Sequence, residues 1–296
     1  MITTRTAKQC GQADYGWLQA RYTFSFGHYF DPTLLGYASL RVLNQEVLAP
    51  GASFQPRTYP KVDILNLILD GEAEYRDSDG NHVQAKAGEA LLLAAQPGIS
   101  YSEHNLSKVK PLTRMQLWLD ACPERENALV QKIPLSTAQQ QLLASPDGEQ
   151  NSLQLRQQVW VHHITLEKGE SLNFQLHGPR AYLQSIHGTF HAMTHNEERE
   201  ALTCGDGAFI RDEPNITAGC RYAAARITGR FTGVASQKRS RKMSKKSAKK
   251  RQPVVKPAVQ ETMSATVPLG YEEMLTELEA IVADAEARLA EEEAAA

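Results

Sequence analysis

The same order of short strands and glycine-containing turns occurs twice between residues 37 and 217, and this duplication limits what the chain can fold into. In the first half an apolar strand ends at Asp70-Gly71, and the segment AGEALLL follows. In the second half a strand ends at His187-Gly188, and GDGAFI follows. Short apolar runs with a turn roughly every ten residues are typical of an all-β sandwich or barrel. The sequence therefore predicts two similar β-barrels in tandem.

The duplication also predicts the domain boundaries. Residues 1–121 are expected to hold an N-terminal arm, which runs to Leu35, and the first barrel. The second barrel is expected over residues 152–217. Residues 122–151 are polar, rich in Gln and contain prolines, so we interpret them as a connector made of a helix and a loop.

The composition changes after Thr217. The next residues are rich in Arg, Ala and Gly, as in a shifted reading frame, and Met243 begins a segment that resembles the start of an unrelated protein. Both a natural extension and a frame-shifted fusion remain open at this point. We expect no alternating strand after Thr217, so the second barrel would be truncated and would lack its last strand. Residues 218–270 are expected to be a disordered basic segment.

Two features of this tail suggest partners. Residues 238–251 contain nine Lys or Arg and no acidic residue, which predicts at most non-specific attraction to nucleic acid. Residues 271–296 carry apolar residues at helical spacing among nine acidic ones, which predicts an acidic amphipathic helix that could bind a protein partner.

The composition excludes several classes of protein. No apolar run is long enough to span a bilayer and no signal peptide precedes the arm, so we expect a cytoplasmic protein that does not contact membranes. The four cysteines lie far apart, which argues against a zinc site or a disulfide framework. Cys10 and Cys122 are the candidates for redox sensitivity, provided that they are exposed.

The first barrel contains the outline of a metal-binding motif. Cupins bind a metal through the pattern G(x)5HxH(x)3-4E, because imidazole and carboxylate groups suit iron, copper, nickel or manganese. Counting from Gly51 places Arg57 and Tyr59 at the two His positions and Asp63 at the Glu position. An apolar strand, ILNLILDG, follows. This segment resembles the pirin family, which includes quercetin dioxygenases and in which it reads HPHRxxE.

A second segment carries the same resemblance. The pirin pattern AGxGIxHSEYN corresponds here to QPGISYSEHN, with Tyr101 in place of the His and with Glu103 retained. The resemblance covers both barrels, from about Phe24 to Thr217, and implies a bicupin fold. It also implies that three family ligands are replaced by Arg57, Tyr59 and Tyr101, so that Glu103 is the one retained ligand.

These replacements change the chemistry that the resemblance implies. The guanidinium of Arg57 stays protonated and has no acceptor, so it cannot be a ligand. We therefore expect no metal cofactor and no catalytic residue. Arg57 either forms an ion pair with Glu103 in a satisfied polar core or faces the barrel mouth and binds an anionic or carbonyl ligand. The predicted function is a non-catalytic protein that binds a small anionic or aromatic ligand or that regulates a partner. The alternative is a quercetin 2,3-dioxygenase that uses a divalent metal such as iron.

The candidate residues of the ligand pocket are Arg57, Tyr59, Asp63, Tyr101 and Glu103.

Overall fold

The computed structural model describes residues 1–220 and 225–232, and in this part of the chain the prediction of an all-β bicupin is confirmed. Apart from strands, the described residues form two short 3-10 helices, Ala7–Gln9 and Glu149–Asn151. They contain no helix that is long and apolar enough to cross a membrane. The predicted acidic helix and the basic run at residues 238–251 lie outside the described residues.

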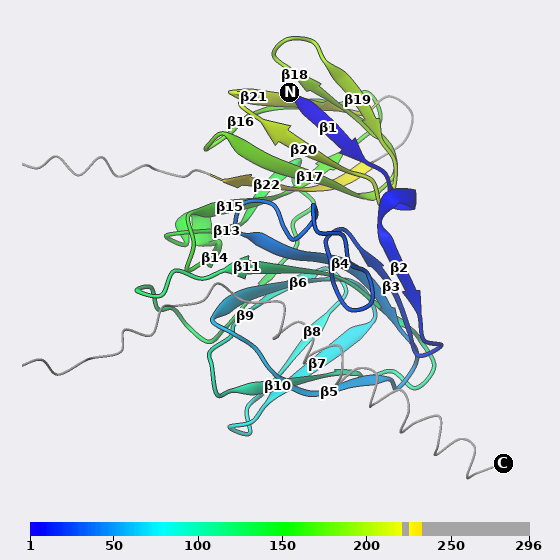
Figure 1. The fold of residues 1–296 in the computed structure, drawn as a ribbon, viewed down its shortest axis with the longest axis vertical. Helices are drawn as coiled ribbons and strands as arrows, with labels where there is room; N and C mark the ends of the chain where they lie inside the picture. The colour runs from blue at the N-terminus through cyan, green and yellow to red at the C-terminus, as the bar shows by residue number, and fades with distance from the viewer. Residues whose placement is uncertain (221–224, 233–296) are drawn as a thin grey trace, which may run out of the picture. The chain divides into compact units, whose positions relative to one another are not determined.

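The first barrel consists of a seven-stranded and a four-stranded sheet (Figure 1). The order of the seven-stranded sheet is β12 (Val130–Pro134), β9 (Glu89–Ala94), β6 (Val62–Asp70), β11 (Leu112–Asp120), β4 (Leu40–Leu48), β3 (Leu18–Tyr22) and β2 (Gly11–Asp14). The order of the four-stranded sheet is β5 (Ser53–Thr58), β10 (Ser100–Asn105), β7 (Glu72–Asp77) and β8 (His82–Lys86).

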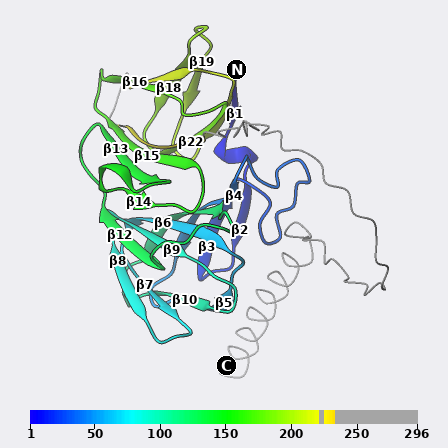
Figure 2. The same ribbon diagram turned by 90° about the vertical axis from the view of Figure 1, so that its left-hand side faces the viewer.

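The second barrel repeats this arrangement, as Figure 2 shows from another side. The order of its seven-stranded sheet is β1 (Ile2–Arg5), β20 (Gly207–Arg211), β17 (Arg180–His187), β22 (Ala225–Thr232), β15 (Val159–Leu166), β13 (Gln140–Ser145) and β14 (Leu153–Gln154). The order of its four-stranded sheet is β16 (Ser171–Gln175), β21 (Asn215–Gly219), β18 (Phe190–Thr194) and β19 (Arg199–Leu202).

Strand β6 shows how the cores are built, because its side chains alternate between two faces. Leu65 and Leu67 belong to a core cluster that also contains Val161 of the second barrel. Ile64 and Ile68 belong to a different cluster, which fills the inside of the first barrel. Burial on both faces explains why this strand is apolar along almost its whole length. The two seven-stranded sheets therefore pack against each other (Figure 1).

The strand pairing differs from the predicted domain boundaries. Strand β1, expected in the first domain, pairs with β20 of the second barrel, whereas β2 and β3 belong to the first. The predicted helical connector at residues 122–151 is wrong: β12 pairs with β9 of the first barrel and β13 pairs with β15 of the second. The physical reason is that β9 and β15 would otherwise be open sheet edges, which these two segments cover.

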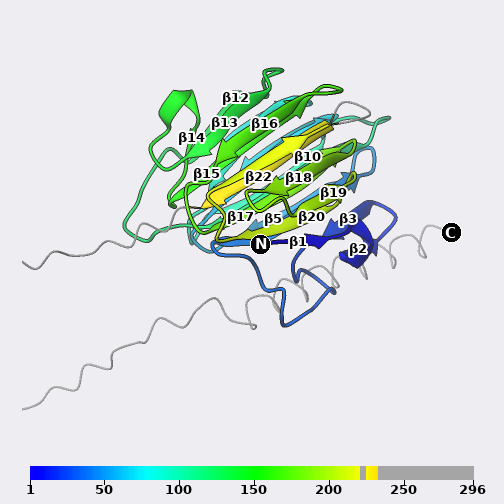
Figure 3. The same cartoon turned by 90° about the horizontal axis from the view of Figure 1, so that it is seen from above.

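The predicted absence of a last strand in the second barrel is also wrong. The backbone of β22 pairs antiparallel with both β15 and β17, so this strand lies inside the seven-stranded sheet (Figure 3). The segment ARITGRFT does alternate in polarity, although it lies in the Arg- and Gly-rich region that we expected to be disordered. Sheet pairing on two sides outweighs a composition that is unfavourable for a strand.

Candidate functional site

Strands β5 and β10 bring four of the five predicted pocket residues together. The two strands pair antiparallel, with Tyr101 opposite Arg57 and with Glu103 opposite Phe54. Tyr59 follows directly after β5, and its ring centroid lies 6.2 Å from that of Tyr101. The two motif segments thus form neighbouring strands of the first barrel.

Glu103 is buried and has two partners of its own. One of its carboxylate oxygens, Oε1, accepts hydrogen bonds from the Arg114 Nε, at 2.6 Å, and from the Tyr75 hydroxyl, at 2.9 Å. The other end of the Arg114 guanidinium lies against a second carboxylate, with Nη2 at 2.8 Å from Oε2 of Glu46. Arg114 is therefore held between two buried carboxylates inside the first barrel.

The predicted ion pair between Arg57 and Glu103 is wrong, because the cation beside Glu103 is Arg114. Arg57 lies instead over the Phe54 ring, with its guanidinium carbon 5.0 Å from the ring centroid. The guanidinium carbon of Arg114 lies 5.5 Å from the same centroid. Arg114 lies outside both motifs, because the second motif ends in β10 and Arg114 lies on the next strand, β11.

A sequence signal for this residue does exist. In β11 the polar residues Arg114 and Gln116 alternate with apolar ones, and all of them are buried. Gln116 donates a hydrogen bond to Asn66, at 2.8 Å, and accepts one from the indole of Trp118, at 2.7 Å. One face of β11 thus contributes a polar network to the inside of the barrel, where buried polar groups need partners.

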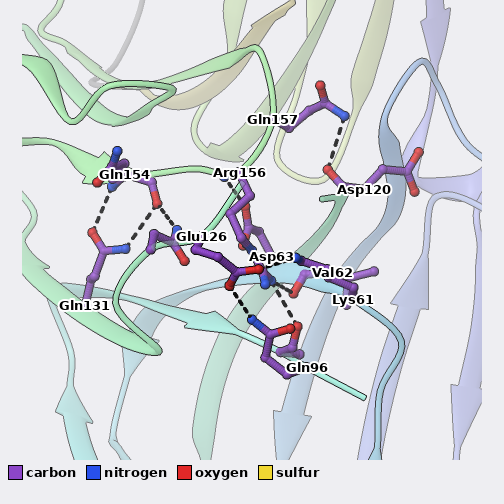
Figure 4. A network of polar contacts seen from close by, with 12 residues as sticks. Lys61, Val62, Asp63, Gln96, Asp120, Glu126, Gln131, Gln154, Arg156 and Gln157 are labelled. Atoms are coloured by element: carbon purple, nitrogen blue, oxygen red, sulfur yellow. Dashed lines mark hydrogen bonds and ion pairs between the residues drawn. The ribbon is translucent and has the colours of Figure 1, made fainter. Parts of the chain in front are cut away.

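Asp63, the fifth pocket candidate, pairs with Arg156, which precedes strand β15 of the second barrel (Figure 4). Its carboxylate accepts hydrogen bonds from Nε of Arg156, at 2.8 Å, and from the backbone N–H of the same residue, at 2.6 Å. Arg156 also donates to the carbonyl oxygens of Val62 and Ala95. Asp63 is therefore part of a buried ion pair between the barrels.

The side chains at the ligand positions of the motif do not fit a divalent metal. Arg57 cannot donate an electron pair, and the Oε1 oxygen of Glu103 is already engaged by Arg114 and Tyr75. Burial raises the pKa of Tyr101, which opposes the phenolate form that a metal would require. Within the described residues, no group of three or more His, Cys, Asp or Glu could hold a metal ion.

The charge of the cluster affects the protonation of Glu103. Burial raises the pKa of this carboxyl and the charge of Glu46 raises it further, while Arg114 lowers it. The net direction is upward, so burial and the charge of Glu46 together outweigh Arg114 in setting the pKa of Glu103. Tyr75, which donates to Glu103, has a pKa well above its ordinary value because it is buried.

We expect this effect to appear as a pH dependence of stability. A carboxyl whose pKa is raised on folding binds its proton more tightly in the folded chain than in the unfolded chain. The favourable contribution of Glu103 to the free energy of unfolding is fully present below the ordinary pKa of glutamate. It is lost as the pH rises through the pKa that Glu103 has in the folded chain. The free energy of unfolding, relative to that of Glu103→Gln, should therefore fall from acidic to neutral pH in urea titrations. A relative free energy that rises with pH would mean that Arg114 outweighs burial.

The two redox candidates differ in exposure. Cys10 is buried, and burial raises the pKa of its thiol, which disfavours the reactive thiolate. Cys122 is partly exposed and follows β11. Redox sensitivity of either thiol stays a prediction.

Two family profiles each match one barrel, and related proteins match both barrels at once. Residues 3–119 match the profile of the family described as Pirin, and residues 142–225 match the one described as Quercetinase C-terminal cupin domain. The Pirin-like protein YhaK of Escherichia coli (strain K12) is 84% identical over 217 residues, which cover 73% of this chain and 93% of that protein. The chain belongs to the pirin family. The family resemblance found in the sequence is thereby confirmed.

Other pirin relatives have names that state an activity or a metal. A protein named quercetin 2,3-dioxygenase, from E. coli (strain K12), is 33% identical over 222 residues, covering 73% of this pirin and 93% of the relative. The crystal structure of the bacterial pirin YhhW from E. coli in complex with nickel(II) has a TM-score of 0.73 and 29% identity, covering 79% of this chain and 100% of that one.

The tail of this pirin matches a different family. Residues 243–296 match the profile described as Uncharacterised protein YhaL. The match begins at Met243, where the sequence indicated the start of an unrelated protein. The match to the C-terminal cupin ends at residue 225, the first residue of β22.

Proposed function

We propose that this pirin is a non-catalytic protein whose first barrel binds a small organic ligand without a metal. The observation that carries the proposal is the contact between Arg114 and Glu103, at 2.6 Å. A guanidinium supplies the positive charge that the carboxylate requires, and it leaves no position for a divalent cation at that oxygen. The proposal retains the cytoplasmic location expected from the sequence.

The alternative function is that of the relatives named quercetin 2,3-dioxygenase, which would require a metal held through Glu103. Elemental analysis of the purified full-length chain, beside an oxygen-consumption assay with a flavonol, separates the two functions. We expect substoichiometric iron, copper, nickel and manganese and no oxygen consumption above buffer. The dioxygenase relative from E. coli, assayed under the same conditions, is the positive control.

Glu103→Gln serves as the matched variant in this experiment. It removes the charge of the one retained family ligand and leaves the size of the side chain unchanged. Stoichiometric metal in the parent that disappears in Glu103→Gln, together with flavonol-dependent oxygen consumption, would overturn the proposed function. Equal and substoichiometric metal in both chains would support it.

A further inference from the structure

A cavity of about 450 Å³ lies in the first barrel between the β7–β8 hairpin and the start of β12. Its volume is in the range of small-molecule binding sites. Most of its wall is hydrocarbon, contributed by four aliphatic residues, Val83, Leu93, Leu129 and Val130. Leu129 and Val130 are 39% and 36% exposed, so this wall keeps apolar surface that a ligand can cover.

Asp77 brings a negative charge to this apolar wall. It lies on the same face of β7 as the buried Tyr75, because side chains two residues apart on a strand point to the same side. Its carboxylate accepts hydrogen bonds from the backbone N–H groups of Asp79 and Asn81 and from the side-chain amide of Asn81. These donors are neutral, so they orient the carboxylate in the hairpin turn without balancing its charge.

The charge of Asp77 has no counter-ion in the part of the chain that the structure describes. His82, which also lines the cavity, lies 3.7 Å from a carboxylate oxygen of a different residue, Glu74. Burial raises the pKa of Tyr101, another residue of the wall, and the charge of Asp77 raises it further. The field of the Asp77 carboxylate therefore acts on the groups that line the cavity.

An uncompensated carboxylate beside apolar walls determines the charge of a suitable ligand. An anion would be repelled, and an uncharged apolar molecule would remove water from the carboxylate without supplying a counter-ion. A divalent metal ion needs several oxygen or nitrogen ligands, whereas Asp77 is the one carboxylate among the described residues that line the cavity. A protonated amine supplies a single positive charge and N–H donors, and its hydrocarbon part suits the aliphatic wall.

We propose that this cavity binds an organic cation, a protonated amine with a compact apolar body, whose charge pairs with the Asp77 carboxylate. The inference rests on the proposed function, since it names the class of the small organic ligand. It differs from the anionic class that the sequence suggested, because that class was inferred from Arg57, which is not part of the lining.

Three ligands with a similar apolar body and different charge test the proposal: 2-cyclohexylethylamine, 2-cyclohexylethanol and 3-cyclohexylpropanoate. The amine is protonated at neutral pH, as the amine of lysine is. In isothermal titration calorimetry of the full-length chain, the amine should bind at one site per chain and at least about tenfold more tightly than the alcohol, because hydrogen bonds to charged groups contribute more than neutral ones. The propanoate should not bind. Equal affinities of amine and alcohol, or binding of the propanoate, would overturn the inference.

Two variants of the hairpin turn locate the charge that selects the amine. Asp77→Asn keeps the size of the side chain and removes its charge, so the preference for amine over alcohol should disappear. Asp79→Asn removes a carboxylate from the same turn that does not line the cavity, so most of the preference should remain. A distorted hairpin would weaken both ligands alike, whereas loss of charge weakens the amine alone. A folded Asp77→Asn chain with the parental preference would contradict the assignment, and the charge series in the parent chain does not depend on either variant.

Failure here is distinguishable from failure of the proposed function. A chain without metal that binds the amine no better than the alcohol contradicts the cation assignment and leaves the proposed function standing. A chain that binds metal stoichiometrically through Glu103 contradicts the proposed function, whatever the amine does.

Discussion

Deletion of Ala225–Thr232 is expected to abolish cooperative unfolding of the second barrel. Strand β22 pairs with β15 over the whole length of both strands and with β17 on its other side. Its removal leaves a gap in the middle of a seven-stranded sheet and two unpaired strand edges. We expect a loss of more than about 5 kcal/mol, which is comparable to the entire stability of many domains. Thermal unfolding by circular dichroism, with hydrogen exchange of the amides in β15 and β17, measures this loss.

A chain that ends at Val234 is the matched control, since the compact unit of the structure extends over Met1–Val234. It retains β22 and should therefore still unfold cooperatively, unlike the deletion variant. If the deletion variant kept the parental melting temperature and slow exchange in β15 and β17, then β22 would not be a strand of this sheet.

The barrel fold could be predicted from the sequence because its signal is local. Apolar runs such as Ile64 to Leu69 end at Asp and Gly turns, and the same pattern recurs in the second half of the chain. Which sheet a strand joins is a non-local property, and here the prediction failed. Strand β1 pairs with residues more than two hundred positions away, and nothing in the sequence of Ile2–Arg5 identifies β20 as its partner.

In the candidate site, too, the sequence predicted local features and did not predict contacts between distant strands. Arg57, Tyr101 and Glu103, which the motifs selected, lie on two strands that pair with each other. The motifs did not identify the partner of Glu103, because a guanidinium can reach it from any strand that faces the inside of the barrel. Asp63 matched the motif by spacing, yet its side chain pairs with Arg156 of the other barrel. Spacing along a strand fixes neighbours within a sheet and leaves contacts across the core undetermined.

Arg114→Met is expected to destabilise the chain by about 3 to 5 kcal/mol, because it leaves two buried carboxylates, Glu46 and Glu103, without their cation. Arg57→Met removes a guanidinium of the same size from the same Phe54 ring, but not the partner of Glu103. It should cost less than Arg114→Met, because Glu46 and Glu103 keep Arg114 as their cation. Free energies of unfolding in urea at neutral pH measure both variants.

A double-mutant cycle separates charge from packing in this result. If Arg114 stabilises Glu103 through charge, then Glu103→Gln should be much less harmful in the Arg114→Met background than in the parent, and the coupling energy should be large. The same cycle with Arg57 in place of Arg114 should give a coupling close to zero. A large coupling between Arg57 and Glu103, with none between Arg114 and Glu103, would restore the ion pair first expected from the sequence. It would also remove the observation on which the metal-independent function rests.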